Sequence, residues 1–302
     1  MRAAITAMRE TTNRIYRDRS LAGVDGSMVK VNEVFELVGN DELADAEKRY
    51  LPKKDKSSSA IILAASRGSA FGDITKETPK CMLEVRGQPL LRRLVDTFRD
   101  WGVRDVTVVR SYKKDKINLP DIQTVDNDMH ERTGEIGSLA CAMGALQGPV
   151  YVAYGDTLFR QYFIDLIEDM DADIVIVADT QWHKRASDAS DWVRDFVKCS
   201  RPYSASYLDE ETVYLESVGN DISNAECHGE WTGLTKFSEK GAAVARAEIE
   251  DIQKDGTLKD AGLPELLTRL ANKGEKIAVV YLAGQWLDVD DYADLIKAGK
   301  FL

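Results

Sequence analysis

Cysteine and histidine are scarce in this sequence. The chain of 302 residues has four cysteines and three histidines. The cysteines lie far apart, and none has the Cys-x-x-Cys spacing typical of a zinc site or the pattern of a disulfide framework. They are Cys81, Cys141, Cys199 and Cys227. We therefore expect reduced thiols in a cytoplasmic protein, and no zinc site.

Long apolar runs are also missing. No stretch approaches the roughly 20 apolar residues that a membrane-spanning helix needs. The start, MRAAITAMRETTNRIYRDR, is basic but lacks the apolar segment of a secretory signal. Acidic residues follow soon after, which argues against an amphipathic transit peptide. The sequence predicts no contact with a membrane.

Positive charge is in deficit. The chain has 51 acidic and 40 basic residues, a formal net charge of -11. Such a charge repels nucleic acid, so we expect no nucleic-acid partner. A polyanionic ligand would have to be captured locally, by a loop, a lysine or a metal ion.

The patterns of apolar and charged residues divide the chain into two parts. Residues 1–51 have the apolar spacing of helices. The charged and serine-rich stretch PKKDKSSS then predicts a linker at residues 52–59. Residues 60–302 form the second part, in which short apolar strands alternate with helices. Such alternation favours an α/β fold with a mixed, mostly parallel sheet covered by helices on both faces.

The predicted elements of residues 60–302 follow from apolar periodicity. The strands expected are Ala60–Leu63, Val106–Arg110, Ile122–Val125, Val150–Tyr154, Ile174–Ala178 and Lys276–Leu282. The helices expected are Leu90–Trp101, Gly137–Leu146, Gln161–Met170, Glu239–Gln253, Pro264–Lys273 and Asp291–Ala298. The region from Asp191 to Phe237 is rich in further strand-like pieces.

The stretch AIILAASRGSAFGDITKETPKCML places a long loop of small residues directly after the first strand. Small residues let backbone N–H groups approach a phosphate closely, and Lys80 at the end of the loop can add a positive charge. In a doubly wound sheet, ligands bind at this edge. The residues alone leave two interpretations open, a phosphate-binding loop and an ordinary loop with a solvated lysine.

Acids follow two other apolar segments. Asp156 comes after VYVAYG, and Asp288, Asp290 and Asp291 lie in GQWLDVDDYADL. Acids at strand ends can hold Mg²⁺, which commonly takes one or two carboxylates and completes its shell with phosphate and water. Alternatively, Asp156 caps a helix that begins at TLFRQYF, and Asp290 or Asp291 caps the last helix.

Several motifs together resemble a known family. They are AIILAASRG, TPKCMLEVRGQPLLRRLVDTFRDWGV, DVTVVRSYKKDKI, TGEIGSLACAMGAL, VAYGDTLF, GEWTGLTKFS and WLDVDDYADL. In this order they are similar to the nucleotidyltransferase (NTP transferase) domain, most of all to cytidylyltransferases of the phosphonate and phosphocholine type. The resemblance implies a Rossmann-like, three-layer α/β/α nucleotidyltransferase fold over residues 60–302.

The resemblance also implies site residues. Lys80 matches a lysine that contacts phosphate, and Asp156 and Asp290 match metal ligands, with Asp288 assisting. We therefore expect Lys80, Asp156 and Asp290 to be catalytic, with Mg²⁺ or another divalent cation. The residues that resemble the nucleotide-binding set, besides Lys80, are Ala64, Ala65, Ser66, Arg67, Gly68 and Ser138.

The loop departs from the family pattern at two positions. The family loop usually reads G-x-G-x-R, and here Ser66 replaces the first glycine and Ala70 replaces the arginine. Arg67 or Lys76 could supply the missing charge, and the sequence does not decide between them.

The substrate pocket is less clear, since an aminophosphonate needs an acid or an aromatic face. The candidates are Trp182, Trp231, Tyr112 and Glu230. Packing or surface exposure explains each of them equally well. We favour Glu230 and Trp231, because GEWTGLTKF resembles the substrate-side strand of the family. Glu135 and Arg132 are weaker candidates.

The expected function is activation of a small phosphonate, 2-aminoethylphosphonate or 2-hydroxyethylphosphonate, by CTP with release of pyrophosphate. Alternatives are a phosphocholine cytidylyltransferase, a sugar-1-phosphate nucleotidyltransferase, and a nucleotide-sensing or scaffold domain without turnover. Residues 1–51 resemble the C-terminal tail of a phosphoenolpyruvate mutase, whose catalytic barrel this sequence lacks. A homodimer, or a fused or partner mutase domain, is therefore expected.

Overall fold

The computed structural model describes residues 58–185, 194–206, 211–259 and 261–301. The helical segment predicted for residues 1–51, and most of the linker predicted for 52–59, lie outside the described residues. Within them, no helix is both long enough and apolar enough to cross a membrane.

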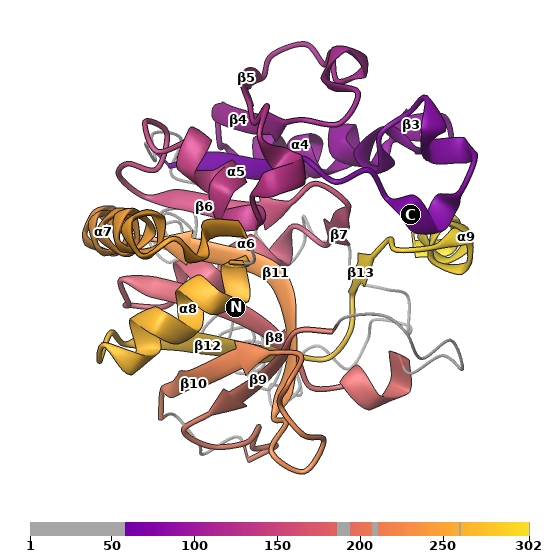
Figure 1. Ribbon diagram of the computed structural model, residues 1–302. Coiled ribbons are helices and arrows are strands. Elements are labelled where there is room, and N and C mark those ends of the chain that lie inside the picture. Colours follow the sequence, from indigo (N-terminus) through magenta and orange to yellow (C-terminus); the bar gives the residue numbers. More distant parts are fainter. Residues whose placement is uncertain (1–57, 186–193, 207–210, 260, 302) are drawn as a thin grey trace, which may run out of the picture. The chain divides into compact units, whose positions relative to one another are not determined.

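A mixed sheet of nine strands runs through the described residues (Figure 1). Its order is β5 (Gln123–Asp126), β4 (Asp105–Arg110), β1 (Ser59–Ala64), β6 (Val150–Tyr154), β11 (Gly229–Phe237), β8 (Ile174–Asp179), β12 (Ile277–Leu282), β10 (Val213–Gly219) and β9 (Phe196–Cys199). The first four strands are parallel, and β12 is parallel to β8. Both β11 and β10 run antiparallel to their neighbours. The prediction of a mixed sheet is thus confirmed.

The main helices are α4 (Leu90–Trp101), α5 (Glu135–Cys141), α6 (Tyr162–Glu168), α7 (Glu239–Asp255), α8 (Leu263–Asn272) and α9 (Tyr292–Phe301). Most of them lie within two residues of the predicted bounds. The helix expected to reach Leu146 ends instead at Cys141, and turns follow it. Gly144 and Gly148 lie in this stretch, and glycine disfavours helix because it loses the most backbone entropy on ordering.

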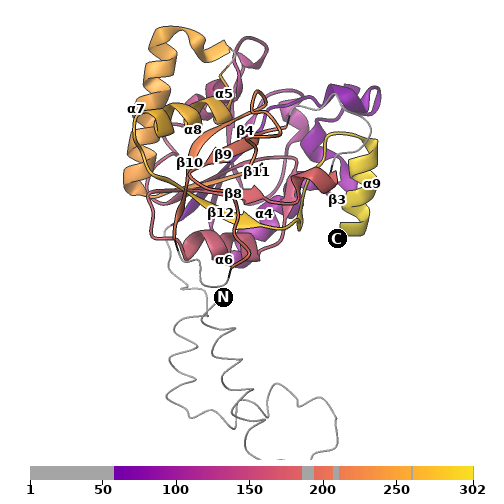
Figure 2. The ribbon, with the colours of Figure 1, turned by 90° about the horizontal axis from the view of Figure 1, so that it is seen from below.

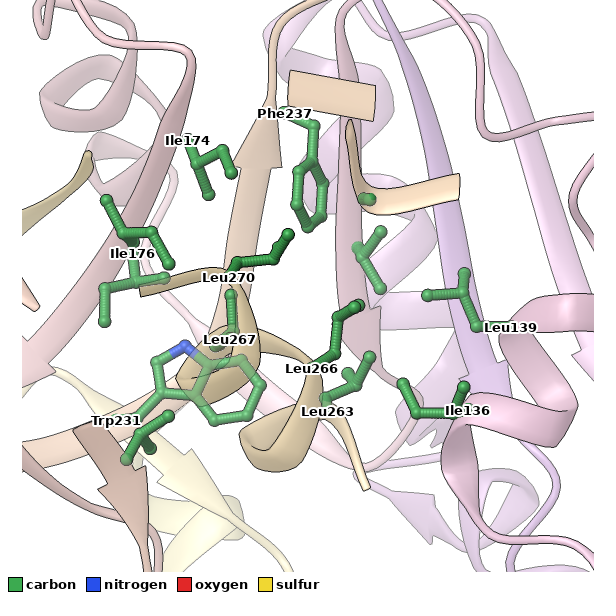
Figure 3. Packing of buried hydrophobic residues seen from close by; sticks show 14 of the residues in the cluster. Ile136, Leu139, Ile174, Ile176, Trp231, Phe237, Leu263, Leu266, Leu267 and Leu270 are labelled. Carbon is green, nitrogen blue, oxygen red and sulfur yellow. The ribbon is translucent and has the colours of Figure 1, made fainter. Parts of the chain in front are cut away.

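Two apolar cores lie on opposite faces of the sheet, with α4 and α6 on one face and α5, α7 and α8 on the other (Figure 2). Successive residues of a strand point to opposite faces, so Ile61 packs under one layer of helices and Ile62 under the other. On the second face, Leu263, Leu266 and Leu270 of α8 point toward the strands (Figure 3).

A second, two-stranded sheet joins β7 (Thr157–Phe159) to β13 (Trp286–Asp288). The sequence analysis did not predict these strands, and one of its alternatives placed a helix directly after Asp156. The register sets Thr157 opposite Asp288. Because this sheet pairs segments about 130 residues apart, it fixes the acids that flank both strands.

Candidate functional site

Lys80 lies between two acids that are distant in the sequence. Its Nζ is 2.9 Å from Asp156 Oδ2 and 2.5 Å from Asp290 Oδ1. The lysine side chain is only 7% exposed, against 16% for Asp156 and 30% for Asp290. The structure therefore brings together the three residues that the sequence predicts to be catalytic.

Electrostatics keep this lysine charged. Burial disfavours the ammonium, but the charges of Asp156, Asp288 and Asp290 outweigh this penalty and raise the pKa of Lys80 well above its usual range. Asp156 and Asp290 both pair with this single ammonium, so by formal charge one negative charge remains. Such surplus charge favours a further cation at this position.

The β7–β13 sheet explains why the two acids meet. Asp156 immediately precedes β7, and the N–H of Val289, just after β13, donates to the Asp156 carbonyl at 3.3 Å. Asp290 is the next residue along. Asp156 is not a helix cap, because a strand follows it. Asp291 caps α9 instead, accepting the Asp294 N–H at 2.8 Å, which leaves Asp290 available to Lys80.

The loop between β1 and Lys80 is folded into short turns of 3₁₀ helix, η2 (Ser69–Phe71), η3 (Ile74–Lys76) and η4 (Lys80–Met82). Gly68 has a φ of 71°, in the left-handed region. A Cβ at Gly68 would lie 2.7 Å from Lys80 Cβ. Glycine is needed here because the loop packs directly on the stem of the lysine.

The other nucleotide-binding candidates differ in their surroundings. Ala64 is buried at the end of β1, while Ser66 and Arg67 are exposed on the loop, with Ala65 partly exposed between them. Ser138 is 4% exposed in α5, and its hydroxyl accepts a hydrogen bond from Asn127 Nδ2 at 3.0 Å.

The two cations considered for the missing arginine also differ. Lys76 Nζ pairs with Asp73 Oδ1 at 2.7 Å. The Arg67 guanidinium lies 5.5 Å from the ring centroid of Tyr112. In the part of the chain that the structure describes, no ion pair joins Arg67 to an acid.

The predicted substrate residues lie in packed or paired positions. Trp231 is 2% exposed within the core beneath α8 (Figure 3). Glu230 is paired with Arg194, whose guanidinium donates to both of its carboxylate oxygens. The carbonyl of Trp182 accepts a further bond from Arg194 at 2.5 Å. The structure thus does not bring Trp231 to the surface of the site, because its indole fills the core, and the charge of Glu230 is already compensated.

Sequence reasoning missed one acid near the site. Asp195 precedes β9, and its carbonyl accepts the Trp231 N–H at 2.7 Å. Burial raises the pKa of Asp195 to about 7, and the charges of Glu135, Glu230 and Asp290 add to the rise. In sequence, Asp195 is one of several acids before an apolar run, so no local signal distinguished it.

Glu135, a weaker candidate in the sequence analysis, has a similar environment. It accepts hydrogen bonds from Tyr154 Oη at 2.5 Å and from Leu263 N at 3.0 Å. Desolvation nevertheless raises the pKa of Glu135, and the charge of Asp156 contributes. Asp195 and Glu135 thus extend the acidic surroundings beyond Asp156 and Asp290.

The donor set is compatible with a divalent cation. Among the described residues, no three His, Cys, Asp or Glu side chains are grouped as a metal site, and Lys80 lies between Asp156 and Asp290. Carboxylate oxygens are the ligands that Mg²⁺ prefers, and two of them suffice when phosphate and water complete the shell. The residues present fit a magnesium ion that arrives with a nucleotide.

Comparisons with known proteins identify relatives of this chain. Over 254 residues the chain is 24% identical to a CTP:phosphoglutamine cytidylyltransferase of Campylobacter jejuni, covering 78% of this chain and 97% of that protein. It is 28% identical over 115 residues to a 2-aminoethylphosphonate cytidylyltransferase of Lancefieldella rimae, covering 36% and 47%. A segment of 51 residues is 55% identical to a phosphoenolpyruvate phosphomutase of Tetrahymena pyriformis, covering 17% of each chain.

The fold is shared with solved structures. The CTP:phosphocholine cytidylyltransferase of Streptococcus pneumoniae superposes with a TM-score of 0.61 at 18% identity, covering 81% of this chain and 99% of that one. The family profile of MobA-like NTP transferase domains matches residues 60–217. Because this profile covers more than half of the chain, the protein belongs to the family of MobA-like NTP transferase domains and is a nucleotidyltransferase.

Proposed function

We propose that this protein is a cytidylyltransferase that uses CTP to activate a small phosphonate, 2-aminoethylphosphonate or 2-hydroxyethylphosphonate. A phosphonate oxygen attacks the α-phosphorus of CTP and forms a new P–O–P bond. The bond between the α-phosphorus and the bridging oxygen breaks, and its electron pair leaves with pyrophosphate. The observation that carries the proposal is the position of Lys80 between Asp156 and Asp290, beside the loop after β1.

The charge and position of each site residue suggest its role in the proposed reaction. Both reactants are anions, so the main tasks are positioning and neutralisation of charge. Lys80 holds phosphate oxygens of the nucleotide, and the backbone amides from Ala64 to Gly68 approach the phosphates closely. Asp156 and Asp290, with Asp288 beside them, would hold a divalent cation. When bound, that cation would polarise the α-phosphate and orient the phosphonate. No general base is required, since a phosphonate is ionised near neutral pH.

The acids at the site support an amine-bearing phosphonate over a hydroxyl-bearing one. Besides burial, the charges of three other acids, Glu135, Glu230 and Asp290, raise the pKa of Asp195. Among the described residues, no lysine or arginine forms an ion pair with Asp195 or Glu135. An ammonium group would relieve the repulsion among these carboxylates, whereas a hydroxyl would not. The relative named a 2-aminoethylphosphonate cytidylyltransferase adds support.

The substrate panel that tests the proposal measures pyrophosphate release with Mg²⁺. CTP, UTP, ATP and GTP are each paired with 2-aminoethylphosphonate, 2-hydroxyethylphosphonate, phosphocholine and glucose 1-phosphate. We expect turnover with CTP and a phosphonate, at the highest kcat/KM with the amine. A preference for phosphocholine or the sugar phosphate would establish one of the alternatives. Binding of CTP without turnover on any acceptor would favour a nucleotide-sensing domain.

Arg67 is the cation that we propose to meet the triphosphate in place of the family arginine, because Lys76 is already paired with Asp73. Arg67→Ala should lower kcat/KM for CTP by about a factor of ten to a hundred, the range expected for one charge-assisted contact. The matched change Lys76→Ala should alter it less than threefold. The reverse order in steady-state kinetics would transfer the role to Lys76.

A functional link to phosphonate synthesis also forms part of the proposal. The 51-residue similarity to a phosphoenolpyruvate phosphomutase supports a protein in which phosphonate formation and activation are coupled. The test is to search for the mutase catalytic domain on the natural polypeptide, by mass spectrometry of the protein isolated from its source. If that domain is absent from the natural polypeptide, the mutase would have to be a separate partner protein.

A further inference from the structure

Three hydroxyl groups hold backbone carbonyls of the loop between Ser66 and Lys80. Thr75 Oγ1 donates to the Gly68 carbonyl at 2.8 Å, and Tyr112 Oη donates to the Lys76 carbonyl at 2.8 Å. Tyr292 Oη donates to the Phe71 carbonyl at 2.9 Å, across 221 positions of the sequence. Tyr292 differs from the other two, because it begins α9, two positions after Asp290.

The contact between Tyr292 and Phe71 involves the rings as well. Their centroids lie 5.5 Å apart with the planes tilted by 58°. Phe71 is fully buried, whereas Tyr292 remains 47% exposed. The ring of Tyr292 thus packs on Phe71 on one side and is open to solvent on the other. The hydroxyl contact fixes the Phe71 backbone in the middle of the loop.

The backbone on both sides of Tyr292 is held by hydrogen bonds at the start of α9. Asp291 Oδ1 accepts the Asp294 N–H at 2.8 Å, and Asp294 Oδ2 accepts the Asp290 N–H at 3.3 Å. The same short turn thus presents Asp290 to Lys80 and Tyr292 to Phe71. The start of α9 therefore contacts the loop twice. Tyr292 holds its middle at Phe71, and Asp290 holds its end at Lys80.

We propose that Tyr292 is a positioning residue for the nucleotide loop, holding the Phe71 carbonyl so that the turn from Gly68 to Phe71 keeps its place over Lys80. The loop and Lys80 are in direct contact at Gly68, so a shift of the turn moves the lysine stem. The identity of the nucleotide rests on the proposed function. The contact between Tyr292 and the loop is independent of the proposed function, and its effect on the loop can be measured without substrate.

The first experiment is hydrogen exchange on the full chain without ligand. Tyr292→Phe removes the hydroxyl and keeps the ring over Phe71. We expect exchange at the Phe71 and Gly72 amides, which bond to Gly68 and Ser69 in this turn, to become roughly threefold to tenfold faster, as one lost hydrogen bond implies.

The matched control is Tyr281→Phe, which removes a hydroxyl that donates to the Arg201 carbonyl at 3.0 Å, on another part of the sheet. This variant should leave exchange in the loop unchanged. Unchanged loop exchange in Tyr292→Phe would overturn the proposal. So would faster exchange throughout the protein with a lower Tm, because that result would indicate a general structural role.

The second experiment separates positioning from chemistry. In Tyr292→Phe, KM for CTP should rise about threefold to tenfold, while KM for the phosphonate and kcat stay within about twofold of wild type. An unchanged KM for CTP alongside faster loop exchange would overturn the positioning role. If wild type turns over no nucleotide–phosphonate pair, the proposed function fails, and the exchange experiment still decides whether Tyr292 holds the loop.

Discussion

Lys80 is central to the proposed chemistry, and its charge is held by acids from two distant segments. Burial alone would favour a neutral amine. The charges of Asp156, Asp288 and Asp290 reverse this preference and raise the pKa of Lys80 above its usual range, which favours the ammonium form near neutral pH. The consequences for the acids can be tested one at a time.

Asp156→Asn and Asp290→Asn should each lower kcat by about a hundredfold or more, because each removes one preorganised charge from the reacting centre. The matched control is Asp291→Asn, one position further on. Asn caps a helix as well as Asp does, so this variant should keep both its kcat and its Tm. Steady-state turnover and thermal unfolding are the measurements. Near-wild-type turnover in either of the first two variants would remove that residue from the catalytic set.

Asp195 should leave a signature in the pH dependence of stability. Its pKa of about 7 in the folded protein lies above the value of about 4 for an unfolded chain. The folded state therefore binds this proton more tightly, and the free energy of unfolding rises through this residue as pH falls from about 7 toward 4. Asp195→Asn should be more stable than wild type at pH 8, with a smaller difference at pH 5.

Urea unfolding at both pH values measures this effect. The control is Glu250→Gln, an exposed position on α7. Its stability relative to wild type should change little between the two pH values. A difference for Asp195→Asn that grows toward pH 5 would contradict the assigned direction of the shift.

Two short elements determine where the site lies. The β7–β13 sheet joins the segments that carry Asp156 and Asp290, and the loop after β1 brings Lys80 against both. A strand of three residues has too short a pattern to be distinguished from the start of a helix. Its partner strand lies about 130 residues away, so no local window of sequence contains the pairing.

Gly68→Ala tests the contact between the loop and Lys80. The new Cβ would approach Lys80 Cβ to 2.7 Å, at a φ of 71°. The matched control is Gly87→Ala, which has a φ of 73° but no atom within 4 Å of the added Cβ. Both changes should cost about 1 kcal/mol of stability for the left-handed backbone. The first alone should also lower kcat/KM for CTP, by at least tenfold.

Equal kcat/KM in the two glycine variants, measured under identical conditions, would show that the loop does not need its close approach to Lys80. A loss confined to stability in both would assign Gly68 a purely conformational role.

At the scale of the described fold, the groups proposed to be catalytic lie outside a sheet that is covered on both faces. Apolar residues alternate between the two cores along β1, β4, β6 and β8, so the sheet is held by helices on either side (Figure 2). Asp156, Asp290 and Lys80 lie outside the strands and take no part in these cores. Removal of a divalent cation should therefore stop turnover and leave the thermal stability of the fold nearly unchanged.

Removal of divalent cations with EDTA should abolish turnover and change Tm by less than about 2 °C, because Lys80 already compensates part of the acidic charge. Addition of Mg²⁺ and CTP at about 100 times Kd should raise the free energy of unfolding by roughly 2.7 kcal/mol, and Tm by several degrees. Thermal unfolding under the three conditions measures both effects. A large fall in Tm with EDTA alone would instead make the cation structural.

The sequence alone was sufficient for the layered α/β fold, because buried strands and amphipathic helices leave local periodic patterns. Short windows also showed a lysine after a loop of small residues and acids after apolar segments, and the resemblance to nucleotidyltransferases then singled out Lys80, Asp156 and Asp290 among them. The tertiary structure decided what those windows cannot contain. It set Asp156 beside Asp290 through β7 and β13, placed Trp231 in the core, added Asp195, and joined Tyr292 to Phe71. In each case the partner is remote along the chain, so the contact depends on strand pairing and helix packing rather than on local residue order.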